Sequence, residues 1–138
     1  MTILFAASEV APDACTGGLG EVLAALPRYM AEQGHETVVV LPGYPALMEG
    51  AAELGVHFSL AVGDSLQPVT LFERTQPDGT QVLLIHNDAL FGRPGIYGDA
   101  NSPYQDNALR FTFFSRAVVE LAKRLDPQPD ILHLHDWQ

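Results

Sequence analysis

Residues 2–41 read TILFAASEVAPDACTGGLGEVLAALPRYMAEQGHETVVVL, and this stretch determines the class of the fold. It begins with an unbroken apolar run over residues 2–8 and ends with a second over residues 37–41, as strands buried on both faces do. Between the runs, apolar residues recur every three or four positions from Leu19 to Met30, which is the spacing of one helix face. A strand, a glycine-rich loop, a helix and a strand together predict a βαβ unit with a right-handed crossover.

The rest of the chain continues this alternation of strands and helices. We expect a short helix near residues 46–54, strands near residues 56–62, 69–74 and 81–85, a loop over residues 86–105, a helix over residues 106–124 and a strand over residues 131–134. The pattern predicts an α/β, Rossmann-like fold, with flanking helices on a mostly parallel sheet. Since a parallel strand is normally followed by a covering helix, we expect residues 1–138 to be part of a larger domain.

The composition limits the classes of partner. The 138 residues include 7 Lys or Arg and 17 Asp or Glu, which gives a formal charge of -10. Nucleic acids and anionic membranes both need clustered cations, so neither is expected as a partner. No apolar run approaches the ~20 residues of a membrane span, and no basic region precedes the first apolar run as in a signal peptide. Because Cys15 is the single cysteine, an internal disulfide is excluded, which favours a soluble, cytoplasmic protein.

The glycine-rich loop CTGGLG, residues 15–20, joins the first predicted strand to the first helix. Backbone N–H groups and the helix dipole attract anions at such a position, so a nucleotide phosphate site is one interpretation. The loop does not match the dinucleotide fingerprint, because Leu23 stands where the last glycine is required, and it lacks the P-loop lysine. The alternative is a tight turn that needs glycine only for its backbone geometry. The first 27 residues contain no Lys or Arg, so a phosphate there depends on backbone donors or on cations from elsewhere.

The last predicted strand ends in polar and aromatic residues. His133 and His135 are two residues apart and point to one face, so a metal site completed by Asp136 is one hypothesis. A carbohydrate site is a second, in which the Trp137 indole packs against a sugar and Asp136 accepts its hydroxyl groups. Tyr97, in the long loop that follows an earlier strand, is expected at the same rim of the sheet. A strand end with polar residues and no ligand is the third interpretation.

Four motifs together resemble the amino terminus of bacterial glycogen synthase and plant starch synthase. Residues 7–22, ASEVAPDACTGGLGEV, resemble the family pattern ASE-x-x-P followed by K-T-G-G-L-[AG]-D-V. RPGIY at residues 93–97, DNALRF at residues 106–111 and LHLHDW at residues 132–137 resemble the family's R-P-G-x-Y, D-N-x-x-R-F and V-H-x-H-D-W. The motifs follow one another in the family's order along nearly the whole chain.

The resemblance implies a retaining glycosyltransferase built from two Rossmann-like domains, the GT-B architecture. Residues 1–138 would be the amino-terminal part of its catalytic domain, without the second Rossmann domain. Such enzymes transfer glucose from ADP-glucose to the non-reducing end of an α-1,4-glucan such as glycogen, with no metal or other cofactor. Because half of the cleft is absent, the resemblance also implies that this chain alone is inactive. A non-catalytic carbohydrate- or nucleotide-binding module derived from the family is the alternative, and a metal hydrolase using His133, His135 and Asp136 is a more remote one.

The resemblance also assigns roles to individual residues. The implied substrate-binding residues are Cys15, Thr16, Gly17, Gly18, Glu21, Tyr97 and Trp137, and the implied catalytic residue is Asp136. Residues 16–18 would lie by the phosphates of the nucleotide sugar, while Tyr97 and the strand end would face glucose and glucan. Cys15 stands where the family has lysine, and losing such a charge-assisted contact to phosphate typically costs ~1.5–3 kcal/mol. Glu21 stands where the family has aspartate, which keeps the charge on a longer side chain.

Overall fold

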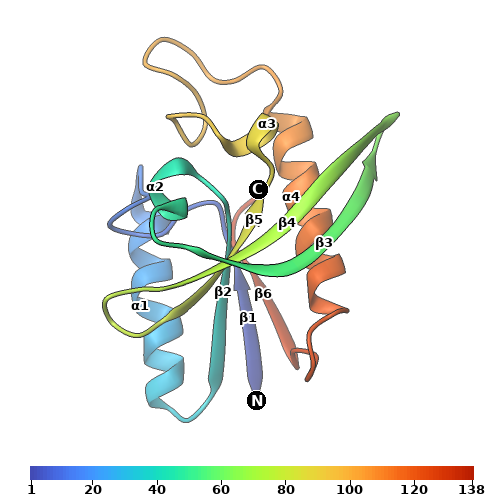
Figure 1. The fold of residues 1–138 in the computed structure, drawn as a ribbon. Coiled ribbons are helices and arrows are strands. Elements are labelled where there is room, and N and C mark those ends of the chain that lie inside the picture. Colours follow the sequence, from blue (N-terminus) through green and yellow to red (C-terminus); the bar gives the residue numbers. More distant parts are fainter.

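A six-stranded sheet and two long helices form the frame of the protein, and the computed structural model describes residues 1–138 (Figure 1). The strands are β1 (Thr2–Ala6), β2 (Glu36–Pro42), β3 (Ala52–Val62), β4 (Ser65–Thr75), β5 (Gln81–His86) and β6 (Ile131–Leu134). The helices are α1 (Gly18–Glu32), α2 (Pro45–Met48), α3 (Asp88–Phe91) and α4 (Asn107–Ala122). The strands lie in the order β3-β4-β5-β2-β1-β6.

The sheet is mixed. β5, β2, β1 and β6 are parallel neighbours, which confirms the predicted βαβ unit, and the pairing of β1 with β6 sets Ala6 opposite Leu134. β4 and β3 extend the sheet as an antiparallel hairpin beyond β5. This hairpin reaches over α4, where the Arg124 guanidinium lies 4.5 Å from the centre of the Phe58 ring (Figure 1).

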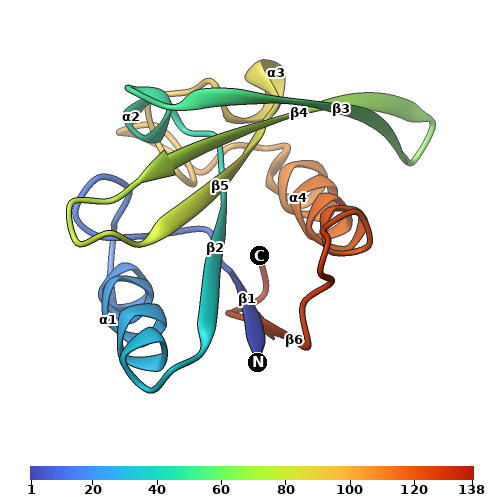
Figure 2. The same ribbon diagram turned by 60° about the horizontal axis from the view of Figure 1, so that its bottom comes forward.

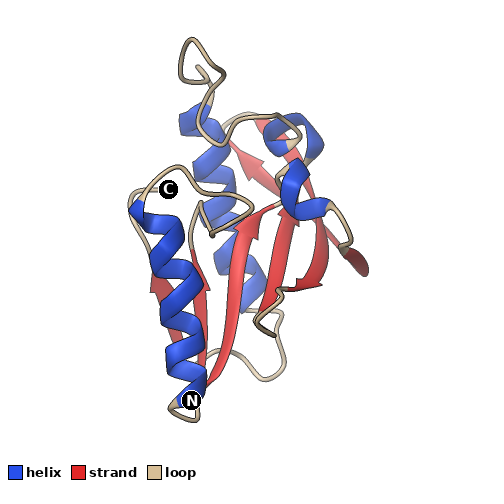
Figure 3. Ribbon diagram, turned by 90° about the vertical axis from the view of Figure 1, so that its left-hand side faces the viewer, coloured by secondary structure: helices blue, strands red, loops and turns tan.

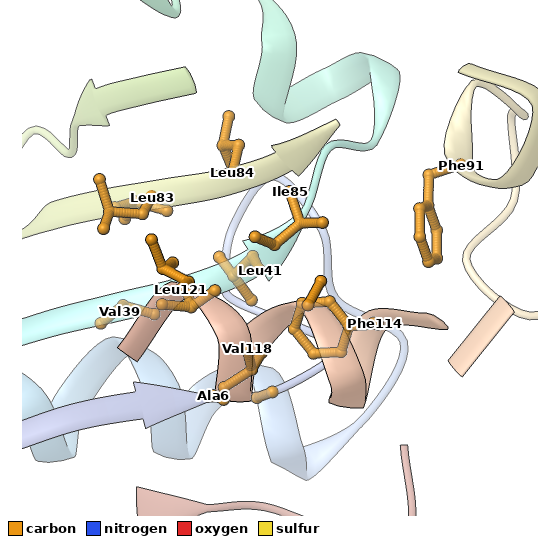
Figure 4. Packing of buried hydrophobic residues seen from close by; sticks show 14 of the residues in the cluster. Ala6, Val39, Leu41, Leu83, Leu84, Ile85, Phe91, Phe114, Val118 and Leu121 are labelled. Carbon is orange, nitrogen blue, oxygen red and sulfur yellow. The ribbon is translucent and has the colours of Figure 1, made fainter. Parts of the chain in front are cut away.

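The two long helices cover opposite faces of the sheet, α1 on one side and α4 on the other (Figures 2 and 3). Phe114, Val118 and Leu121 recur along α4 at the spacing of one helix face, and all three are buried. They point toward buried residues of the parallel strands, among them Leu41 and Ile85 (Figure 4). Because β5, β2, β1 and β6 are parallel, their carboxyl ends lie at one rim of this packed sheet.

Two sequence predictions were wrong in detail. The helix expected near residues 46–54 ends at Met48, because Gly50 turns the chain at φ +74° and residue 52 already belongs to β3. The loop expected over residues 86–105 contains the short helix α3, whose first turn is capped by the Asn87 side chain accepting from the Leu90 amide at 3.1 Å. None of the helices combines the length and the apolar character needed to cross a membrane.

The parallel strands reverse their order beside β1. From β1 the chain crosses to β2 on one side, and after α4 it returns to β6 on the other side. In open α/β sheets, ligands bind at such a point, outside the carboxyl ends of the two strands. Residues 7–17 after β1 and residues 135–138 after β6 occupy this place.

Candidate functional site

The Glu9 carboxylate is the centre of the rim after β1. Its side chain is buried, with the residue 4% exposed. One oxygen accepts hydrogen bonds from the backbone N–H groups of Thr16 at 2.7 Å and Gly17 at 3.2 Å. The other accepts from the Thr16 hydroxyl at 2.8 Å. The glycine-rich loop is therefore folded around a carboxylate of its own chain.

Tyr97 reaches the same carboxylate from the loop after α3. Its hydroxyl donates to Glu9 Oε1 at 2.7 Å and lies 2.7 Å from the Ser8 hydroxyl. Burial by itself raises the pKa of Glu9, but the hydrogen bonds from Tyr97, Thr16 and Gly17 outweigh it, so the pKa lies below its ordinary value. Burial, and then the hydrogen bond to Glu9, raise the pKa of Tyr97. The pair is thus a stable carboxylate and a protonated phenol.

The glycine-rich loop has only part of its backbone free for a ligand. The N–H groups of Thr16 and Gly17 are already bonded to Glu9. Gly18 begins α1, and the first N–H groups of a helix have no acceptor within the helix. Of the three residues expected beside phosphates, Gly18 is therefore the one whose N–H group is available.

Cys15, expected at the position of the family lysine, is turned toward the helix. Its thiol donates to the Gly17 carbonyl at 3.2 Å. A Cβ atom at Gly20 would lie 2.5 Å from Cys15 Sγ, so only glycine fits there beside this side chain. Glu21 is exposed in the first turn of α1 and forms no hydrogen bond with the Glu9 cluster. The structure brings Thr16, Gly17 and Tyr97 together but leaves Glu21 outside the cluster.

Arg110 supports the loop that carries Tyr97. It is fully buried in α4, where its Nε donates to the Leu90 carbonyl at 2.6 Å and its Nη1 to the Ile96 carbonyl at 2.8 Å. Arg93 and Asp106 add a two-bond ion pair, at 2.7 and 2.6 Å, between the same loop and the start of α4. Arg110 and the Arg93–Asp106 ion pair thus fix the part of the loop that leads into Tyr97.

The residues after β6 form the exposed part of the site. Trp137 is 68% exposed, and its ring lies edge-on to Phe111 with 5.4 Å between the ring centres. The Tyr97 ring lies 5.8 Å from the same Phe111 ring. Asp136 is exposed, has φ +57° and forms no hydrogen bond with its side chain. The His135 N–H group donates to the Ala6 carbonyl at 3.1 Å, which keeps this segment beside the end of β1.

A hollow beside the Glu9 cluster and a larger one remote from it are two candidates for a ligand site. One of about 410 Å³ is bounded by Thr16 and by loop residues including Tyr97 and Gly98. A larger one, of about 590 Å³, lies at the opposite end of the sheet beside Thr2 and Glu36, remote from the predicted site. We assign the site to the smaller hollow because it is lined by Thr16 and Tyr97, which both form hydrogen bonds with the buried Glu9 carboxylate.

The two histidines of the metal hypothesis bond to each other. His133 Nδ1 and His135 Nε2 are 2.8 Å apart. Burial, and then the neighbouring His133, lower the pKa of His135. No group of three His, Cys, Asp or Glu side chains is arranged to hold a metal ion.

Sequence reasoning missed the roles of Glu9 and Arg110. Glu9 follows a buried strand within an otherwise apolar stretch, and Arg110 interrupts the buried face of a helix. A charged residue in such a position was the available signal, since charged side chains are rarely buried without partners.

Comparisons with known proteins identify the family. A family model for the starch synthase catalytic domain matches residues 2–138. The chain belongs to this family. The glycogen synthase of Anaeromyxobacter dehalogenans (strain 2CP-C) is 47% identical over 140 residues, and that of Geotalea uraniireducens (strain Rf4) is 43% identical over 140 residues. Each alignment covers all of this chain and 29% of the relative, so the chain spans less than a third of their length.

A solved structure shares the fold as well as the family. The catalytic domain of starch synthase IV from Arabidopsis thaliana, bound to ADP and acarbose, superposes with a TM-score of 0.83 and 31% sequence identity. The match covers 99% of this chain and 28% of that one. The predicted Rossmann-like α/β fold is thereby confirmed, as is the predicted resemblance to the glycogen and starch synthase family.

Proposed function

We propose that residues 1–138 are the amino-terminal part of the catalytic domain of a glycogen (starch) synthase. The reaction is the retaining transfer of glucose from ADP-glucose to the non-reducing end of an α-1,4-glucan. Membership of the starch synthase family supports it, and so does the likeness to a starch synthase with ADP and acarbose bound. The proposed setting is the cytoplasm, with no cofactor beyond the donor substrate.

The observation that carries the proposal is the shared rim of Glu9, Tyr97 and Trp137 at the point where the strand order reverses. A sugar offers apolar C–H faces to aromatic rings and hydroxyl groups to carboxylates, and the rim has both kinds of group. We assign the sugar-facing wall to Tyr97, Trp137 and Asp136, with Asp136 as the catalytic carboxylate. The exposed Asp136 carboxylate, beside the Trp137 indole, can accept hydrogen bonds from sugar hydroxyl groups and so orient the sugar ring.

The phosphate-facing wall is the glycine-rich loop. Gly18 offers a free N–H group at the start of α1, and the Thr16 and Gly17 backbone holds its shape. Cys15 supplies no cation, and Glu21 adds a negative charge in the first helical turn. The charge that balances the diphosphate therefore comes from outside residues 1–27, the segment that contains no Lys or Arg.

Transfer of labelled glucose from ADP-glucose to glycogen tests the proposal. The protein containing these residues should incorporate label, and Asp136→Asn should lower the rate by about one to two decades, since a lost charge-assisted hydrogen bond costs ~1.5–3 kcal/mol. Thr112→Ala, an exposed change on α4, is the control and should leave the rate unchanged. A polypeptide of residues 1–138 alone should incorporate none, and incorporation by it would contradict its assignment as one part of the site.

The turned-in side chain of Cys15 favours one alternative, a binding module of the family without catalysis. Calorimetry with ADP, ADP-glucose and maltooligosaccharides separates the two functions when it is paired with the transfer assay. Binding of sugar with no transfer by the protein containing these residues identifies the module. Binding with transfer identifies the synthase.

A further inference from the structure

Glu9 is a buried carboxylate with no cation beside it. Its four hydrogen-bond contacts, at 2.7 to 3.2 Å, come from two backbone N–H groups and two hydroxyl groups. No Lys, Arg or His forms an ion pair with it. Burying a charged group is costly unless its hydrogen bonds are satisfied, so these neutral donors are what keep Glu9 ionised.

The same carboxylate connects segments that are otherwise separate. The donors Thr16 and Gly17 belong to the glycine-rich loop, and Tyr97 lies 88 residues along the chain from Glu9. No hydrogen bond joins residues 15–18 directly to residues 93–105. Removing the carboxylate therefore removes the polar link between the two walls of the hollow that Thr16 and Tyr97 bound.

The bonds also fix the direction of a hydroxyl chain. Tyr97 has one hydroxyl proton, and because it donates to Glu9, the contact at 2.7 Å with Ser8 has Ser8 as the donor. The order is Ser8 to Tyr97 to Glu9. Tyr97 consequently offers a ligand its ring and one remaining lone pair, and no proton.

We propose that Glu9 is the positioning residue of this site, one carboxylate that sets the phosphate-facing loop and the sugar-facing Tyr97 at a fixed separation. The identity of the ligands rests on the proposed function, but the positioning is a property of this chain alone. Glu9 acts through Thr16, Gly17 and Tyr97 and needs no contact with the reacting atoms.

Nuclear magnetic resonance of the isotopically labelled protein tests the positioning without any substrate. In Glu9→Gln the side-chain amide keeps the size of the carboxylate but loses its charge and one acceptor oxygen. Hydrogen bonds to charged groups typically correspond to about 10–100-fold in an equilibrium constant, so exchange of the Thr16 and Gly17 amide protons should accelerate by about that factor. Glu49→Gln, an exposed carboxylate without hydrogen bonds, is the matched control and should leave both exchange rates unchanged.

Tyr97→Phe keeps the test decisive if Glu9→Gln fails to fold. It removes one donor and leaves the bonds from the glycine-rich loop intact, so the Glu9 side-chain resonance should move while the Thr16 and Gly17 amides exchange slowly as before. In the unsubstituted protein, acid titration should move the Thr16, Gly17 and Tyr97 resonances with one shared midpoint. Separate midpoints, or unchanged exchange in a folded Glu9→Gln protein, would overturn the proposal.

The transfer assay separates positioning from a purely structural role. Glu9→Gln should lower kcat for glucose transfer by at least about tenfold at a temperature where the variant is fully folded, with a smaller change in KM, since misplaced groups reduce transition-state stabilisation. An unchanged kcat in the folded variant contradicts positioning. If the unsubstituted protein transfers no glucose but the resonance shifts occur, the proposed function fails while the positioning stands.

Discussion

The glycine-rich loop and the end of β6 lie at one rim, but they are held in different ways. Glu9 is 4% exposed and accepts four hydrogen bonds, so the loop around it has its shape before any ligand arrives. Trp137 is 68% exposed, and Asp136 beside it has no side-chain hydrogen bond. The sequence motifs that mark the two regions are equally distinct, so motif strength does not reveal how firmly a site is arranged.

The positions of β1 and β6 in the sheet explain why the glycine-rich loop and the end of β6 are held differently. β1, which leads into the Glu9 loop, pairs with β2 on one side and β6 on the other. Within residues 1–138, β6 pairs only with β1, and all four of its residues are exposed. A segment that follows an interior strand is surrounded by donors and acceptors, whereas one that follows an edge strand has them on one side only. The two regions meet at Phe111.

Removal of the Phe111 ring should have the largest effect, because both regions rest on it. The ring is 2% exposed and lies against Tyr97 and Trp137. Phe111→Ala should lower the free energy of unfolding by about 3–5 kcal/mol, as truncation of a buried aromatic residue does. Urea unfolding measures this, with the exposed neighbour Thr112→Ala as control, expected to change by less than about 0.5 kcal/mol. A loss below about 1 kcal/mol would show that the two regions do not share this support.

The second largest effect on the free energy of unfolding should come from Glu9→Gln. This effect should depend on pH, and it concerns the glycine-rich loop alone. The pKa of Glu9 lies below its ordinary value of 4.5, so the stabilisation by the carboxylate is fully present above pH 4.5 and is lost as the pH falls through the lower folded-state pKa. The variant should be about 1.5–3 kcal/mol less stable at pH 7, and the gap should shrink toward pH 2. Urea unfolding at several pH values checks both expectations. A difference in the free energy of unfolding that stays constant with pH would mean that the charge of Glu9 does not contribute to stability.

The ion pair of Arg93 with Asp106 should have a smaller effect. The two side chains are 28% and 34% exposed, so solvent weakens their attraction even though two bonds join them. Asp106→Asn should cost about 1 kcal/mol in low salt and less in 1 M NaCl, where exposed charges are screened. Thermal unfolding at both salt concentrations measures the difference. An equal loss in both would assign the effect to hydrogen bonding instead of charge.

Trp137→Ala should change stability least. The exposed indole contributes little to the core, so the free energy of unfolding should fall by less than about 0.5 kcal/mol. Under the proposed function, maltooligosaccharide binding measured by calorimetry should weaken, and Trp137→Phe should restore part of it because a ring is kept. A loss above about 1 kcal/mol in the free energy of unfolding would show that Trp137 also stabilises the fold, so the two regions would not differ in this respect.

The sequence predicted the strands and long helices well, but it did not predict the buried hydrogen bonds that hold the candidate site. The unbroken runs over residues 2–8 and 37–41 predicted β1 and β2, because strands buried on both faces have that pattern. The burial of Glu9 was not predicted, since it depends on Tyr97, a donor 88 residues away that no local pattern reveals. Which of the substrate-binding residues contact a ligand stays a prediction, because contacts at an exposed strand end depend on the ligand as much as on the chain.

The exposure of Trp137 has a practical consequence. It is the single tryptophan of the chain, so the indole fluorescence of residues 1–138 originates from one place, the rim beside Phe111. A ligand that covers this ring should shift its emission to shorter wavelength as water is displaced, while a ligand bound elsewhere should leave the spectrum unchanged. The Trp137 indole thus provides an optical reporter for occupancy of this rim.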